Sequence, residues 1–224
     1  MIGSNEGPAN VTLVIATSNR AKVLEFRALL ADLPVDVVPV SDVLSESISI
    51  VEGSESFEEN ALTKAKAIAD ASMALTLADD SGLEVDALGG RPGVRSARFA
   101  HDRATDAENN AALLAALADV EPENRQARFR CVLALVDPWT LPGLPDMTAE
   151  GTCDGFIARE ARGGGGFGYD PLFIVKGINK TMAELGDVEK NVVSHRAVAV
   201  QALRPRLVAL LENRHRDALR IGMG

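Results

Sequence analysis

The chain has 224 residues, of which 46% are hydrophobic and 25% are charged. This composition is typical of globular proteins and excludes the disordered, collagen-like and membrane classes, while the length predicts one large domain with a sizeable core. The formal net charge of −9 at pH 7 repels phosphate backbones and anionic lipid, so we expect no binding to nucleic acid or membranes. A small anion such as a nucleotide remains compatible, because local basic groups and a divalent cation can reverse the field inside one cleft.

The cysteines and the N-terminal segment indicate the compartment. Cys131 and Cys153 are the two cysteines and form no C-x-x-C pair, so the sequence supports neither a disulfide framework nor a zinc knuckle. Residues 1–10 are polar, and no apolar run approaches the ~18 residues of a membrane span. We therefore expect a cytoplasmic protein, with residues 1–10 as an N-terminal extension and residues 11–224 as a single domain.

Apolar periodicity predicts alternating strands and helices in the first third of the chain. The predicted helices begin and end at polar caps and at proline. In order, these elements are a strand at 11–16, a helix ended by Pro34, a strand at 35–40, a helix to about Ala74 behind the capping box of Ser56 and Glu59, and a strand at 75–78.

The rest of the chain begins with a segment rich in glycine and proline. Gly82, Gly89, Gly90, Pro92 and Gly93 predict a long structured loop after Ala78, with one short strand at 83–85. Strands and helices mixed with a hairpin indicate an α/β fold with a mixed central sheet flanked by helices. The later predicted elements are a helix capped by Thr105 and Glu108, antiparallel strands at 126–136 and 148–159, a short strand at 171–175, and a helix from Ser194 to about Asn213 that Pro205 kinks or splits.

The first candidate site is the motif T-S-N-x-x-K-x-x-E, which contains Thr17, Ser18, Asn19, Lys22 and Glu25. A polar turn after a buried strand places free backbone N–H groups at a helix N-terminus, and Lys22 follows about one turn later. Together these groups suit phosphate oxygens, although the Walker spacing is absent. The alternative is an ordinary helix cap with a solvated lysine.

The second candidate is the acidic pair Asp79 and Asp80, followed by Ser81. Consecutive strand residues point to opposite faces, so only one of the two carboxylates can face a given cleft, and we expect that one to be Asp80, nearer the predicted turn. Such hard oxygen ligands suit Mg²⁺, and Glu52 could supply another. Alternatively, these are solvated acids of a turn.

Two further segments combine glycines, aromatic rings and hydrogen-bond donors. Gly163 to Asp170 reads G-G-G-G-F-G-Y-D, where glycines permit close approach of a ligand and an aromatic ring can stack on a base. Lys190 to Arg196 reads K-N-V-V-S-H-R and places His195 among donors. The alternatives are a flexible connection anchored by its aromatic rings and a structural histidine.

Five motifs in register make the chain similar to the inosine triphosphate pyrophosphatase family, over almost all of its length after about residue 10. They are T-S-N-x-x-K-x-x-E, S-F-E-E-N-A, A-D-D-S-G-L-x-V-D-x-L-G-G-x-P-G-V-x-S-A-R, G-G-F-G-Y-D-P-L-F and S-H-R. The resemblance implies hydrolysis of the non-standard purine nucleotides ITP, dITP and XTP to the monophosphate and pyrophosphate. It also implies a homodimer and an elongated two-lobed fold with the active site between the lobes.

The resemblance assigns roles to individual positions. Asp80 would accept a proton and hold Mg²⁺ together with Glu52. The matching positions for substrate binding are Thr17, Ser18, Asn19, Arg20, Ala21 and Lys22 for the triphosphate, Ser81 as a further substrate contact, and Phe167, Gly168, Tyr169, Asp170, Lys190, His195 and Arg196 for base and phosphate.

The expected chemistry needs no covalent nucleophile. A carboxylate beside a metal-bound water accepts its proton, while Lys22 and Lys190 stabilise charge on the leaving pyrophosphate. Arg196, with His195 beside it, would donate to a 6-oxo group and meet a second donor in adenine. The alternatives are a Maf-like pyrophosphatase acting on pyrimidine or modified nucleotides, against which F-G-Y-D and S-H-R argue, and a non-catalytic nucleotide-binding sensor, against which the presence of Asp80 and Glu52 argues.

Overall fold

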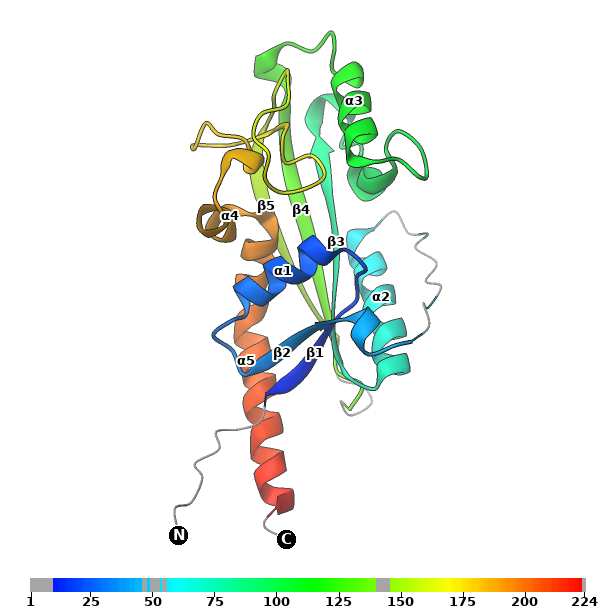
Figure 1. Ribbon diagram of the computed structural model, residues 1–224, viewed down its shortest axis with the longest axis vertical. Helices are drawn as coiled ribbons and strands as arrows, with labels where there is room; N and C mark the ends of the chain where they lie inside the picture. Colours follow the sequence, from blue (N-terminus) through cyan, green and yellow to red (C-terminus); the bar gives the residue numbers. More distant parts are fainter. Residues whose placement is uncertain (1–9, 46–47, 49–52, 54–55, 140–145, 223–224) are drawn as a thin grey trace.

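The computed structural model describes residues 10–45, 48, 53, 56–139 and 146–222. The predicted N-terminal extension lies outside this part except for Asn10, and the predicted metal ligand Glu52 also lies outside it. The molecule is elongated, with long strands that run from a lower lobe to an upper lobe (Figure 1). No helix among the described residues is long and apolar enough to cross a membrane.

One mixed sheet forms the centre of the described structure, with the strand order β2-β1-β3-β4-β5-β6. β1 pairs in parallel with both β2 and β3, whereas the pairs from β3 to β6 are antiparallel. The predicted α/β class with a mixed sheet is therefore confirmed. The strands are β1 (Val11–Ile15), β2 (Val35–Pro39), β3 (Leu75–Val85), β4 (Gln126–Val136), β5 (Met147–Ile157) and β6 (Phe173–Val175).

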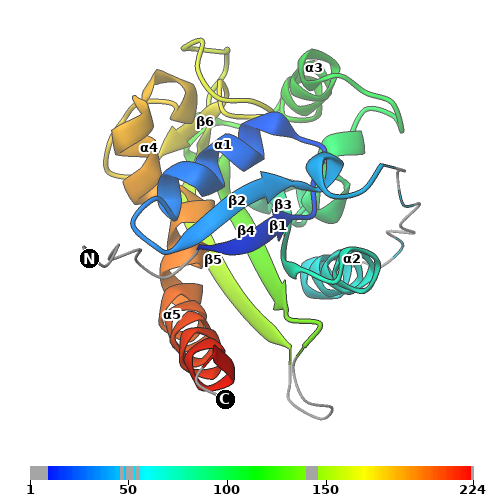
Figure 2. The ribbon, with the colours of Figure 1, turned by 60° about the horizontal axis from the view of Figure 1, so that its bottom comes forward.

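Helices cover both faces of the sheet in the lower lobe (Figure 2). α2 (Phe57–Ser72) buries its alanine-rich side against one face, where Val132 and Ala134 of β4 belong to the same cluster. α1 (Arg20–Leu29) and α5 (His195–Gly222) cover the opposite face, where Leu133 and Leu135 belong to their cluster. The alternation along β4 thus separates two apolar cores.

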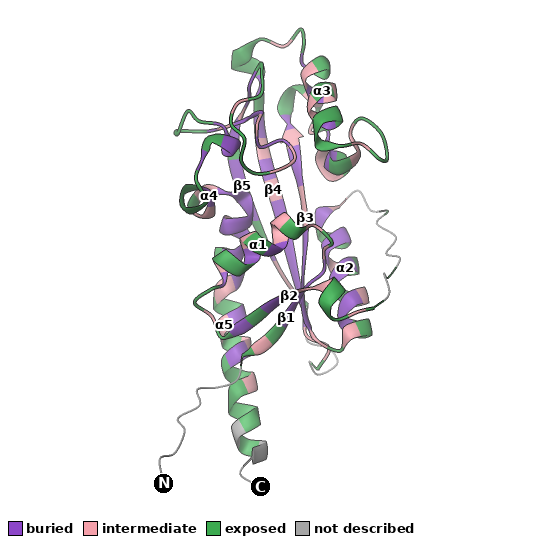
Figure 3. Cartoon of the chain, viewed as in Figure 1, coloured by how far each residue is buried: buried purple, intermediate pink, exposed green. Residues whose placement is uncertain are grey.

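The upper lobe adds a third apolar core on the face that α1 and α5 cover below. α3 (Asp106–Ala116) contributes Leu113 to this core, which Leu117 joins just after the helix, and the segment after β5 contributes Tyr169 and Leu172. Buried residues occur along the long strands in both lobes (Figure 3), and on β5 they alternate with exposed or half-buried ones. α4 (Asp187–Val193) closes the left side and leads through Ser194 into α5.

β3 is one strand of 11 residues, so the predicted loop after Ala78 is wrong. Asp79–Gly82 pair in antiparallel register with residues 130–133 of β4. Gly82 does not interrupt the strand, because a Cβ there would lie 2.3 Å from the carbonyl oxygen of Gly93. The glycine permits that close approach within a continuous strand. The irregular segment begins later, after Val85.

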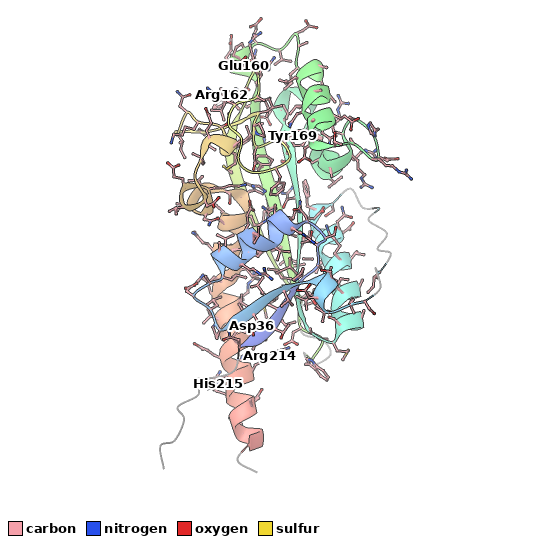
Figure 4. The ribbon with its side chains drawn as sticks, viewed as in Figure 1. Asp36, Glu160, Arg162, Tyr169, Arg214 and His215 are labelled. Atoms are coloured by element: carbon pink, nitrogen blue, oxygen red, sulfur yellow. The ribbon has the colours of Figure 1, made fainter. Side chains whose placement is uncertain are left out.

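The C-terminal helix also differs from the prediction. α5 runs to Gly222, and Pro205 lies inside it without splitting it. Arg214, labelled in Figure 4, extends back from the later part of α5, and its Nε donates to Asp137 Oδ2 at 3.2 Å. This ion pair fixes the helix beyond the proline to the end of β4.

Candidate active site

The turn between β1 and α1 is a capped helix N-terminus. Asn19 Oδ1 accepts the backbone N–H groups of Ala21 and Lys22, at 2.9 and 3.3 Å. Thr17 Oγ1 in turn accepts the N–H of Asn19 at 3.1 Å. Two of the N–H groups that the sequence predicted to be free are thus satisfied by the cap. The positive end of the helix nevertheless faces a cleft that Thr17 to Arg20 and Lys22 line.

Asp79 is enclosed on the face of β3 that α1 and α5 cover. Its side chain is 0% exposed, with Lys22 Nζ at 2.6 Å from Oδ1 and Arg196 Nε at 2.6 Å from Oδ2. Ser81 Oγ donates to Oδ1 at 2.7 Å. Burial opposes the charge, but Arg196 and Lys22 outweigh it and hold the pKa of Asp79 well below its usual range. Asp79 is therefore a permanent anion that orders two cations.

Asp80 points to the opposite face, toward α2. Lys64 Nζ lies 2.8 Å from Oδ1, and Asn60 Nδ2 donates to Oδ2 at 3.2 Å. Its side chain stays 13% exposed, and burial raises its pKa despite the lysine. Asp80 is therefore the more accessible and more basic carboxylate of the pair. The opposite faces agree with the prediction from strand alternation, but the predicted turn that favoured Asp80 is absent, because β3 continues to Val85.

A cleft of about 1160 Å³ brings several predicted residues together. Its lining includes Asp80, Ser81 and Lys64 on one side, the turn before α1 on another, and Ala97 and Arg98 of the 3₁₀ segment Gly93–Arg98. Cations thus approach the acidic pair within a chain of net charge −9. This arrangement suits a phosphate chain, whose charge the local field favours.

The other predicted residues gather in a second cluster. Lys190 Nζ lies 2.8 Å from both Asp170 Oδ2 and Glu25 Oε1, and Glu25 also pairs with Arg196. Burial opposes the charge of Lys190, but the two carboxylates outweigh it and raise its pKa. Because Arg196 also binds Asp79, an unbroken series of ion pairs joins the Gly-rich loop to β3. We call this series the charged seam: Lys22, Asp79, Arg196, Glu25, Lys190 and Asp170.

Arg196 is almost completely enclosed within the charged seam, with 1% exposure of its side chain. Its three nitrogens face Asp79, Glu25 and Ser81. This geometry does not support the predicted contact of Arg196 with a 6-oxo group, because its donors are directed at protein acceptors. His195 beside it is 6% exposed and stacks on Phe129 with 4.8 Å between ring centroids. Burial lowers the pKa of His195 well below its usual range, so the ring is neutral.

The two aromatic residues of the Gly-rich loop have different environments. Tyr169, labelled in Figure 4, is 4% exposed, and its hydroxyl donates to the Ser96 carbonyl at 2.8 Å. Its ring anchors the loop to the core, as the structural alternative predicts, and only its backbone remains for a ligand. Phe167 is half-buried, with Lys190 Nζ at 5.2 Å from the ring centroid. Phe167 is thus the ring of this loop that can present an aromatic face.

The donor set fits a hard divalent cation. Asp80 supplies a partly accessible carboxylate at the cleft, and Mg²⁺ typically takes one or two carboxylates together with water and substrate phosphate. Among the described residues, no three His, Cys, Asp or Glu side chains gather as a metal cluster. An ion held largely by substrate oxygens needs no such cluster.

Sequence analysis missed Asn60, Lys64 and Glu25 as site residues. Asn60 and Lys64 lie one turn apart on the buried side of α2, between Phe57 and Ile68. A sequence signal was available, because these polar residues occupy helix positions where the period of α2 predicts apolar ones. Glu25 belonged to the first motif, but no local pattern indicated its distant partners.

The chain is similar to known proteins over most of its length. A profile of the Ham1 family matches residues 13–206. The chain belongs to the Ham1 family. It is 48% identical over 197 residues to a dITP/XTP pyrophosphatase of Bacillus subtilis, with 88% of this chain and 96% of that protein covered. It is 49% identical over 191 residues to a dITP/XTP pyrophosphatase of Geobacillus kaustophilus, with 85% and 91% covered.

Solved Ham1-family structures share the fold. A HAM1 protein from Coxiella burnetii superposes with a TM-score of 0.78 at 39% identity, covering 89% of this chain and 99% of that one. A nucleoside-triphosphatase / dITP/XTP pyrophosphatase from Mycobacterium abscessus gives a TM-score of 0.68 at 42% identity, covering 87% and 99%. The mixed sheet with its flanking helices is therefore the Ham1 architecture, as the family resemblance predicted.

Proposed function

We propose that this chain hydrolyses non-standard purine nucleoside triphosphates, namely dITP, ITP and XTP, to the monophosphate and pyrophosphate. The observation that carries the proposal is the cleft in which the cationic turn before α1 faces Asp80, an accessible carboxylate of raised pKa. Relatives of this chain at 48 and 49% identity are dITP/XTP pyrophosphatases. The reaction removes deaminated purine nucleotides from the precursor pool.

The triphosphate binds along the cleft in this proposal. The positive end of α1 and the residues from Thr17 to Lys22 contact its oxygens, and Ser81 lines the same cleft from the sheet. Lys22 has three donors, so it can contact phosphate while Asp79 orients it. Between Thr17 and Lys22, the proposed phosphate contacts are Ser18, Asn19, Arg20 and Ala21.

Asp80 acts as the general base. Its raised pKa makes its oxygens more basic than those of an exposed carboxylate, and Lys64 and Asn60 hold them in place. Asp80 would hold Mg²⁺, together with Glu52, which lies outside the described residues. When bound, the ion neutralises phosphate charge and lowers the pKa of a coordinated water.

In this proposal the purine base of the substrate lies against the Gly-rich loop. Phe167 offers the stacking surface, and Gly168, Tyr169 and Asp170 shape its backbone. His195 is neutral, so it can donate from one ring nitrogen and accept at the other. Lys190 and Arg196 are held by carboxylates and position this region through the charged seam.

A product assay tests this proposal. The purified chain is incubated with Mg²⁺ and separately with dITP, XTP, dATP, dGTP and dTTP, and pyrophosphate is resolved from phosphate. We expect pyrophosphate chiefly from dITP and XTP, and its loss in Asp80→Asn. Asp86→Asn is the matched control, because Asp86 is an exposed carboxylate that pairs with Arg128 outside the cleft. Turnover of dTTP would favour the Maf-like alternative, and binding without hydrolysis would favour a sensor.

We further propose a cytoplasmic homodimer, as the family resemblance implies. Val188 and Val192 are 82 and 64% exposed one turn apart on α4, an apolar surface of the kind that interfaces bury. Light scattering after gel filtration should give twice the mass of the chain. A mass equal to one chain at micromolar concentration would contradict the dimer, and recovery of the protein in a membrane fraction would contradict the compartment.

A further inference from the structure

The Gly-rich loop is held by side chains of α3 that none of the motifs includes. Asp106 Oδ2 accepts the backbone N–H of Gly168 at 2.7 Å. Asn110 Nδ2 donates to the carbonyl oxygen of the same residue at 2.9 Å. Both polar groups of Gly168 are thus bound by one helix. We call this pair of contacts the Gly168 clamp.

Helix geometry explains why these two residues act together. Asp106 and Asn110 are four residues apart, so their side chains lie on one face of α3. Thr105 caps the same helix through the capping box with Glu108. Leu113, farther along the helix, is 0% exposed. The clamp therefore extends from a rigid element that is fixed at its N-terminus and in the core.

The clamp acts at a residue that has no side chain to restrain it. Gly168 has a φ of +61°, and a Cβ there would meet nothing within 4 Å. Because glycine populates both signs of φ, the conformation here needs a restraint from other groups. Asn110 Oδ1 is buried without a hydrogen-bond partner among the described residues, so Gly168 is the partner of this amide. The conformation at Gly168 depends on α3.

Phe167 precedes Gly168, and the peptide group that joins them is bound at both ends: Asp170 donates its N–H to the Phe167 carbonyl oxygen at 3.2 Å, and Asp106 accepts the N–H of Gly168. The N–H of Phe167 donates to Asp170 Oδ2 at 3.1 Å, and its ring lies near the cations of Lys190 and Arg196. A turn of the Gly168 peptide would move the ring away from these cations. We propose that Asp106 and Asn110 are positioning residues that orient the ring of Phe167 for stacking on the purine base. This inference rests on the proposed function, and it assigns to the Gly168 clamp a part in the preference of the active site for a purine.

The test separates base binding from phosphate binding. The Michaelis constant for dITP, kcat, and inhibition by inorganic tripolyphosphate are measured for Asp106→Ala and Asn110→Leu. We expect the KM for dITP to rise about tenfold in each, the factor that corresponds to about 1.4 kcal/mol. kcat and the inhibition constant of tripolyphosphate should stay within about twofold of the values for the unsubstituted chain. The variants weaken contacts to the purine base, which bind the substrate and the transition state equally.

Two controls distinguish positioning from a loss of stability. Thr105→Ala removes the cap of α3 without touching Gly168, so it should lower Tm but leave the KM for dITP unchanged. Asp106→Asn keeps an acceptor oxygen for the N–H of Gly168 and should restore most of the affinity that Asp106→Ala loses. An equal rise of KM in Thr105→Ala, or an unchanged KM in both clamp variants, would overturn the inference. Failure of the unsubstituted chain to hydrolyse dITP would instead contradict the proposed function.

Discussion

Asp79 and Asp80 are neighbours on β3, and the two faces of the sheet give their carboxylates opposite environments. On the face of α1 and α5, Asp79 is 0% exposed between Lys22 and Arg196. On the face of α2, Asp80 keeps 13% exposure, with Lys64 as its ion-pair partner. The pKa falls on the first face, where two cations outweigh burial, and rises on the second, where burial outweighs one. One strand thus supplies two carboxylates whose pKa values are shifted in opposite directions.

The difference has a cause in the packing of each face. The charged seam lies between two apolar cores, and its innermost charges, Asp79 and Arg196, are 0 and 1% exposed and have to be paired. Lys22, at 18% exposure, lies at the end of the seam that lines the cleft. The Asp80 side borders the cleft, where a ligand can reach the carboxylate. Removing a charge should therefore cost stability in the charged seam and activity at Asp80.

Removing the cation that bridges two carboxylates of the charged seam should give the largest loss of stability. Lys190→Met leaves the carboxylates of Asp170 and Glu25 buried without their shared partner. We expect a loss of about 3–5 kcal/mol in the free energy of unfolding, measured by denaturant titration. Lys180→Met is the matched control, because Lys180 is half exposed in its pair with Glu189 and should change stability little. Equal effects of the two variants would contradict a difference between the charged seam and the surface.

Gly82 tests the continuity of β3 on the Asp80 face. Gly82→Ala places a Cβ 2.3 Å from the carbonyl oxygen of Gly93 and 2.9 Å from the ring of Phe57, so backbone has to move. We expect a loss of about 1–3 kcal/mol by thermal and denaturant unfolding. Gly164→Ala is the control, since a Cβ there meets nothing within 4 Å. Unchanged stability of Gly82→Ala would contradict the close contact of the strand with this segment.

His195 gives a smaller, pH-dependent effect beside the charged seam. Burial, followed by the charge of Arg196, lowers its pKa in the folded state, whereas the unfolded chain binds this proton at about pH 6.5. Acid therefore favours the unfolded state, and stability falls as pH drops below that value. We expect His195 to account for about 1 kcal/mol lost between about pH 6.5 and 5.5. The comparison with His195→Gln across this range isolates the contribution, and identical pH slopes would contradict a neutral buried ring.

The sequence predicted the order of strands and helices well where periodicity was local. The Ser56 cap of α2, the capping box of α3 and the strands β4 and β5 all lie close to their predicted positions. Gly82 was misread, because its glycine serves contact with a segment eleven positions later rather than a turn. Such contacts depend on tertiary packing, which no local pattern reports.

The candidate site was predictable in its residue types and less so in its connections. Strand alternation alone separates Asp79 from Asp80, and the structure places them on opposite faces. The partners of Arg196 come from α1 and β3, more than a hundred positions earlier in the chain. The motif around Arg196 therefore could not show that its guanidinium is bound by two carboxylates. The site roles of these residues remain predictions that substitution has to test.

The most direct test compares Asp79→Asn with Asp80→Asn in one experiment, measuring dITP turnover and Tm for each. We predict that Asp80→Asn loses a factor of roughly 10²–10⁴ in kcat, the range of general base catalysis, while Tm stays near that of the unsubstituted chain. Asp79→Asn should instead lower Tm by several degrees, because Lys22 and Arg196 lose their buried counter-charge. An Asp80→Asn variant that retains full turnover of dITP would contradict the assignment of Asp80 as the base.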